Sequence, residues 1–145
     1  MKLAVLNGPN LNLLGTREPA LYGTTTLADI EARLRAVSVE LGVDVSCVQH
    51  NGEGELIDAI QALRGRVDGA LINAGAYSHT SLALRDAFAA VEVPYVEVHL
   101  TNVYAREPER RHSMLAPGAR AVLCGFGADG YEWGLRGLVA LLRSS

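Results

Sequence analysis

A tyrosine and an arginine lie five residues apart in the segment GTREPALYGT, residues 15–24. A tyrosine acts as a general base only when its phenolate is stabilised, because the ordinary pKa of a phenol is about 10. A neighbouring guanidinium supplies that stabilisation by Coulomb attraction. Arg17 and Tyr22 are therefore a candidate base and its electrostatic partner, and Gly15 and Gly23 are candidate hinges of a closing loop.

A histidine near the end of the apolar run YVEVHL, residues 95–100, is a second candidate for proton transfer. Imidazole is the usual general acid or base near neutral pH. Glu97 is expected to orient His99 or tune its charge, because alternate side chains share one face of a strand. A buried structural histidine is the alternative, and the position at the carboxyl end of a strand favours the functional interpretation.

Further polar residues follow the other predicted strands, so that Asn, His, Tyr and Arg dominate one rim of the sheet. That rim offers too few carboxylates for a magnesium or phosphoryl-transfer site. No GxxxxGK[ST] phosphate loop is present, and GxGxxG occurs only at 125–130, after the last strand, where tight strand-to-helix packing explains it. Lys2, the only lysine, opens the first strand at the opposite end of the sheet, which argues against imine catalysis.

The bulk composition fits one ordinary globular domain spanning residues 1–145, with 49% apolar and 20% charged residues. A net charge of -3 argues against a nucleic-acid partner. Cys47 and Cys124 lie in apolar runs without zinc-ligand spacing, so small buried hydrophobes are expected. Neither a signal-peptide pattern nor a membrane-length apolar run occurs, which predicts a cytoplasmic protein without a membrane partner.

Short β-rich runs alternate with helical apolar periodicity along the whole chain. Apolar residues at steps of three and four predict a helix from about residue 27, with Thr26 as its N-cap and Gly42 as its stop. The alternation predicts an α/β fold with one parallel sheet covered by helices on both faces, in the flavodoxin-like strand order 2-1-3-4-5. The expected strands are 2–7, 43–49, 68–74, 95–100 and 119–125.

Three segments closely resemble type II 3-dehydroquinate dehydratases: NGPNLNLLGTREPALYG (7–23), INAGAYSHTSLALRDA (72–87) and VEVHLTNVYAREPERRHS (96–113). With the intervening helices, the resemblance covers essentially the whole chain. It implies a flavodoxin-like fold and conversion of 3-dehydroquinate to 3-dehydroshikimate in the shikimate pathway, by anti elimination through an enolate and without cofactor or metal. It also implies a homododecamer built from trimers, in which Asp86 reaches the site of a neighbouring subunit.

The resemblance gives the candidate catalytic residues their roles. Tyr22 matches the base that removes the proton beside the ketone, and Arg17 matches the arginine that keeps the tyrosine ionised. Asn10 matches a residue that stabilises the enolate, in the family through an ordered water molecule. His99, with Glu97 beside it, matches the acid that protonates the departing hydroxyl.

The substrate contacts come from the same resemblance. Asn73 and the backbone N–H groups of Leu100 and Thr101 match a cradle for the substrate carboxylate. The ring hydroxyls are assigned to His79 and Arg110. Arg110 belongs to a basic cluster that also contains Arg106 and Arg111, and Arg106 is a candidate partner for the loop.

The alternative function is a non-enzymatic flavodoxin-like module. A phospho-acceptor signalling domain needs an aspartate after the third strand and a lysine near the fifth, where this chain has Asn73 and no lysine. An electron carrier that binds flavin needs a phosphate loop rich in Ser and Thr near residue 10, and Pro9-Asn10-Leu11-Asn12 does not provide one.

Overall fold

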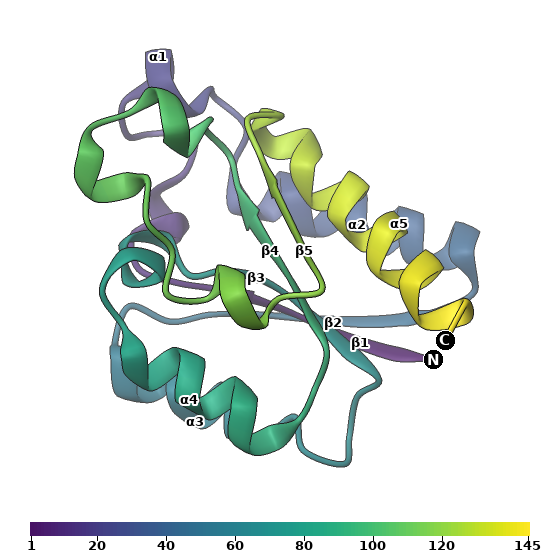
Figure 1. The fold of residues 1–145 in the computed structure, drawn as a ribbon. Coiled ribbons are helices and arrows are strands. Elements are labelled where there is room, and N and C mark those ends of the chain that lie inside the picture. Colours follow the sequence, from purple (N-terminus) through teal and green to yellow (C-terminus); the bar gives the residue numbers. More distant parts are fainter.

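The core of the fold is a five-stranded parallel sheet in the order β2-β1-β3-β4-β5 (Figure 1). The computed structural model describes residues 1–145. The order confirms the predicted flavodoxin-like topology. In this topology β2 lies on one side of β1 and the later strands are added on the other side, so the order of addition switches between β1 and β3. The strands are β1 (Lys2–Asn7), β2 (Asp44–Gln49), β3 (Gly69–Asn73), β4 (Tyr95–His99) and β5 (Ala121–Cys124).

Helices cover both faces of the sheet, with α2 and α5 on one face and α3 and α4 on the other (Figure 1). Each face has its own apolar core, because a parallel sheet must bury both sides. No helix combines the length and the apolarity needed to cross a membrane. The helices are α1 (Pro19–Tyr22), α2 (Leu27–Leu41), α3 (Glu53–Gln61), α4 (Leu82–Val91) and α5 (Gly130–Arg143).

The ends of α2 confirm the expected caps. The Thr26 side chain accepts a hydrogen bond from the backbone N–H of Asp29, and the Asp29 carboxylate accepts one from Thr26 N–H. This reciprocal pair satisfies two N–H groups that the first turn of a helix leaves free. Gly42 ends the helix at φ 68°, a left-handed conformation that glycine adopts without strain.

The loops after β1 and β3 lie in direct backbone contact, which brings their polar residues together. The N–H of Gly8 donates to the carbonyl of Asn73 at 2.8 Å. A Cβ at Gly8 would lie 2.6 Å from the carbonyl carbon of Ala74, so no side chain fits there. Asn10 and Asn73 therefore share the rim at the switch point of the sheet.

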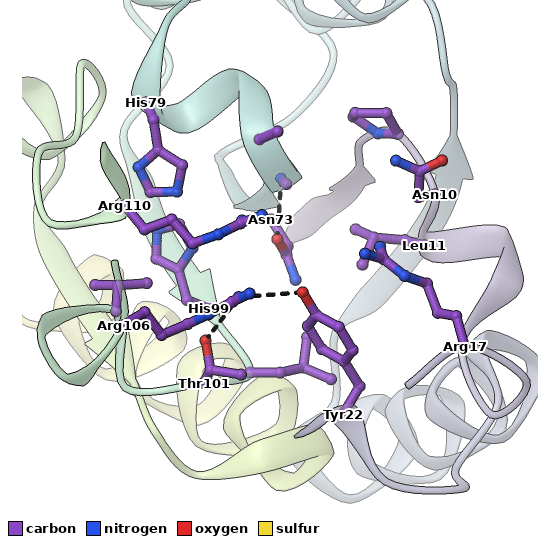
Figure 2. A pocket seen from close by; sticks show the side chains of 15 residues that line it. Asn10, Leu11, Arg17, Tyr22, Asn73, His79, His99, Thr101, Arg106 and Arg110 are labelled. Carbon is purple, nitrogen blue, oxygen red and sulfur yellow. Dashed lines mark hydrogen bonds between the residues drawn. The ribbon is translucent and has the colours of Figure 1, made fainter. Parts of the chain in front are cut away.

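One short helix was not predicted from the sequence. Gly15 and Gly23 were expected to be hinges of a closing loop, and α1 lies between them. Pro19 begins α1 and favours it because its fixed φ suits the first helical position. The single turn ends at Tyr22, whose side chain points toward Arg106 (Figure 2).

Candidate active site

A pocket lies beyond the carboxyl ends of β1, β3 and β4, where ligands bind in open α/β sheets. Its walls come from the loops that follow those strands and from the segment that carries α1. The polar side chains point into one common space, as Figure 2 shows. The residues that line it include Asn10, Arg17, Tyr22, Asn73, His79, His99, Leu100, Thr101, Arg106 and Arg110.

Two guanidinium groups flank the phenol of Tyr22, and they contact it differently. Nη1 of Arg106 donates to the Tyr22 hydroxyl oxygen at 3.1 Å. The guanidinium carbon of Arg17 lies over the ring, 4.7 Å from its centroid. Arg17 therefore acts on the face of the ring as a cation, and Arg106 is the group that bonds the oxygen on which the negative charge of a phenolate concentrates.

A chain of hydrogen bonds through Glu97 and Ser113 fixes the orientation of His99. Nε2 of His99 lies 2.9 Å from Oε2 of Glu97, and both side chains are almost completely buried. The Ser113 hydroxyl accepts from the backbone N–H groups of Leu115 and Ala116, so its own proton goes to Oε1 of Glu97. A carboxylate that accepts at both oxygens takes the Nε2 proton and leaves Nδ1 of His99 as the nitrogen available to a ligand.

His79 stacks on His99, with ring centroids 5.8 Å apart. Nδ1 of His79 lies 2.8 Å from the carbonyl oxygen of His112, which can only accept, so Nδ1 carries the proton. Burial lowers the pKa of His79 and outweighs the hydrogen bond to His112, which raises it, while the guanidinium of Arg110 acts in the same direction as burial. The neutral ring keeps a lone pair on Nε2, which can accept a hydrogen bond from a hydroxyl group.

Asn73 forms part of the pocket floor at the end of β3. Its Oδ1 accepts from the N–H of Gly75 at 3.1 Å, and its Nδ2 donates to the hydroxyl of Tyr131 at 3.0 Å. Leu100 and Thr101 continue directly from β4 on the neighbouring side of the floor. These three residues, predicted for the carboxylate cradle, do lie together.

The remaining predicted residues divide into two groups. Asn10 lines the pocket in a left-handed conformation, φ 69°, and Arg110 lines it while its Nε donates to Glu107. Asp86 is different, because it lies exposed on α4 and does not line this pocket. The structure thus brings Asn10 and Arg110 to the site within one chain and leaves Asp86 outside it.

Sequence patterns did not identify two residues that the structure adds. Ser113 and Tyr131 were missed because each acts from beneath the pocket through another side chain. Arg106 was predicted as a candidate partner for the loop, and its hydrogen bond to the phenol of Tyr22 is such a contact. The chain contains no group of three or more His, Cys, Asp or Glu side chains arranged to bind a metal ion.

A doubly wound α/β fold with this site has the groups that an enzyme needs to transfer protons to and from a small anionic substrate. A phenol under two guanidinium groups faces a carboxylate-supported imidazole, and amide and arginine groups complete the walls. The Dehydroquinase class II family model matches residues 1–139. The chain belongs to this family, and the family assignment replaces the alternative of a signalling or electron-carrier module.

Individual relatives agree with the family assignment over nearly the full chain. A 3-dehydroquinate dehydratase from Gemmatimonas aurantiaca is 65% identical over 143 residues, covering 99% of this chain and 94% of the relative. The crystal structure of type II dehydroquinase from Propionibacterium acnes superposes with a TM-score of 0.91 at 40% identity and covers 96% of each chain. That of type II dehydroquinase from Butyrivibrio crossotus gives 0.92 at 38% identity, covering 99% of this chain and 97% of the other.

Proposed function

We propose that Tyr22 and His99 carry the reaction of this enzyme, the dehydration of 3-dehydroquinate to 3-dehydroshikimate in the shikimate pathway. The observation that supports these roles is that a phenol bonded to a guanidinium and an imidazole bonded to a carboxylate line one pocket. Their environments differ, since cations surround the phenol and a buried anion supports the imidazole. Such an arrangement allows one group to accept a proton as a base while the other donates one as an acid at the same pH.

The first step is removal of a proton from the carbon beside the ketone. The Tyr22 phenolate takes this proton, and the electron pair of the C–H bond moves toward the carbonyl oxygen to form an enolate. Arg106 stabilises the phenolate by a direct hydrogen bond, and Arg17 by its charge over the ring. Asn10 lies at the wall where its amide can stabilise the enolate oxygen, directly or through water.

The second step is expulsion of the hydroxyl group from the opposite face of the ring. The enolate oxygen re-forms the ketone, and the electron pair of the enolate C=C bond becomes the new carbon–carbon double bond. The C–O bond breaks with its electron pair on the hydroxyl oxygen, which takes a proton from His99 and leaves as water. The Glu97 carboxylate stabilises the imidazolium before this transfer. The proton on Tyr22 then passes to solvent and His99 regains one, which restores both groups.

Substrate orientation falls to the floor and the wall opposite Tyr22. The amide of Asn73 and the backbone at Leu100 and Thr101 bind the ring carboxylate. His79 accepts a hydrogen bond from a ring hydroxyl at its free Nε2, and Arg110 donates to another. Holding these three groups of the substrate directs its acidic carbon toward Tyr22, which is the role that positioning plays in catalysis.

The assembly, location and domain organisation belong to the same proposal. The chain forms one catalytic domain over residues 1–145 and assembles as a cytoplasmic homododecamer of four trimers. The exposed carboxylate of Asp86 on α4 is free to reach a neighbouring subunit's pocket. Light scattering after size exclusion measures the subunit number, and a monomer with full activity would contradict a role for Asp86 across an interface.

The decisive experiment gives chelator-treated protein 3-dehydroquinate and follows the absorbance of the conjugated enone that dehydration creates. The absorbance is expected to rise in proportion to enzyme concentration. Substrate deuterated on the face anti to the departing hydroxyl should lose its label to water, and substrate deuterated on the other face should keep it. Loss of the label from the syn face would contradict the opposed placement of Tyr22 and His99.

A further inference from the structure

Three buried polar side chains form a continuous chain of hydrogen bonds beneath the pocket floor. Tyr131 of α5 donates to Oδ1 of Asn7 in β1 at 2.6 Å and accepts from Nδ2 of Asn73 in β3 at 3.0 Å. All three side chains are at most 3% exposed. Asn73 lines the pocket, whereas Tyr131 and Asn7 do not, so any effect of these two residues on the substrate passes through Asn73.

The direction of every hydrogen bond in this chain follows from one backbone group. The N–H of Gly75 can only donate, so Oδ1 of Asn73 faces it and Nδ2 of Asn73 faces Tyr131. The phenol oxygen then accepts, and its single proton goes to Oδ1 of Asn7. This orientation leaves Nδ2 of Asn7 buried without a partner. The amide of Asn7 is therefore oriented to accept the proton of Tyr131, at the cost of an unsatisfied N–H group of its own.

The approach of α5 to the sheet makes this contact possible. A Cβ at Gly134 would lie 2.7 Å from Cδ1 of Leu71 and 2.9 Å from Cγ2 of Val98, so any side chain there would displace these buried methyl groups or the helix. Tyr131 precedes Gly134 by three residues, on the same face of α5. The helix thus delivers a phenol to the point where β1 and β3 both end in asparagine, in register with one another.

We propose that Tyr131 is a positioning residue that fixes the amide of Asn73 for recognition of the substrate carboxylate. With Oδ1 held by Gly75 and one N–H held by Tyr131, the second N–H of Asn73 is left for the pocket. A reversed amide would direct its oxygen at the substrate anion. The inference rests on the proposed contact between Asn73 and the carboxylate, and it adds a residue from a different helix to that subsite.

The test is the Tyr131→Phe substitution, which removes the hydroxyl and keeps the ring. KM for 3-dehydroquinate should rise about tenfold, equivalent to about 1.4 kcal/mol of binding, while kcat changes less than about twofold. A carboxylate contact made equally in the ground and transition states affects KM in this way. Val139→Ala, which removes buried methyl groups two turns further along α5, is the control for lost stability and should leave KM unchanged.

A double-substitution cycle separates positioning from a merely structural effect. Asn73→Ala should raise KM on its own, and adding Tyr131→Phe to it should raise KM no further, because the phenol then has no amide to orient. If Tyr131→Phe does not yield folded protein, Asn7→Leu tests the same chain from its other end. That variant removes the acceptor of the phenol proton at similar volume and should also raise KM with little effect on kcat.

Each outcome supports or contradicts a specific statement. A wild-type enzyme that fails to dehydrate 3-dehydroquinate contradicts the proposed function, whatever the variants do. An active wild type whose KM is unchanged by Tyr131→Phe overturns the positioning role alone. Factors that multiply in the double variant overturn it too, because they show that Tyr131 acts independently of Asn73.

Discussion

Replacing Arg106 with methionine should lower kcat more than the same change at Arg17. Arg106 is the group bonded to the phenol oxygen, at 3.1 Å, and its side chain is only 14% exposed. A hydrogen bond to a charged group contributes about 1.5–3 kcal/mol. At about 1.4 kcal/mol for each factor of ten, Arg106→Met should reduce kcat by about 10- to 150-fold.

Arg17→Met is the matched comparison, because it removes the same charge and keeps a similar side-chain length. Arg17 meets Tyr22 only at the face of its ring, 4.7 Å from the centroid, and its side chain is 32% exposed and also pairs with Glu18 at 3.5 Å. A cation at such a site contributes about 0.5–1 kcal/mol, so kcat should fall by only about 2- to 5-fold. The two residues therefore have different expected losses although both are arginines beside one phenol.

The measurement is kcat at saturating 3-dehydroquinate, followed through the enone absorbance across a range of pH. Both variants should keep the unfolding midpoint of the wild type to within a few degrees, since neither residue is part of the apolar core. The reasoning fails if Arg17→Met loses more activity than Arg106→Met. It fails equally if Arg106→Met raises KM at an unaltered kcat, which would assign Arg106 to substrate binding.

Three further predictions concern the base, a neutral histidine and the helix contact. Tyr22→Phe should lower kcat by about 10²–10⁴-fold while calorimetry shows 3-dehydroquinate binding nearly unchanged. Burial lowers the pKa of His79 below its ordinary value of 6.5, so the unfolded chain binds a proton more readily than the folded one as pH falls below that value, and the folded state loses stability. Urea titrations from pH 7 to 5 should show a smaller loss of stability for His79→Asn. Gly134→Ala should destabilise the fold by about 1–3 kcal/mol in the same assay, and an unchanged midpoint would contradict the tight packing of α5.

The parts of the structure that the sequence predicts well are those set by short-range pattern. The run KLAVLN and the caps Thr26 and Gly42 are local features, and the structure has the first strand and the α2 ends where they indicate. The helix α1 was missed because a single turn has too few residues to show periodicity. Arg106 was undervalued for a different reason: its partner Tyr22 is 84 residues away, and neither residue's neighbours carry a sign of the pairing.

The chain of hydrogen bonds through Asn7, Tyr131 and Asn73 beneath the pocket could not be predicted from sequence patterns. Tyr131 belongs to an amphipathic helix and fits its apolar face, so periodicity alone assigns it to the core. What changes its role is that the parallel register aligns Asn7 with Asn73 at the end of two neighbouring strands, and glycine lets α5 approach the sheet. A core position becomes part of a binding site because two amides require a partner there, and a hydroxyl on that helix supplies one.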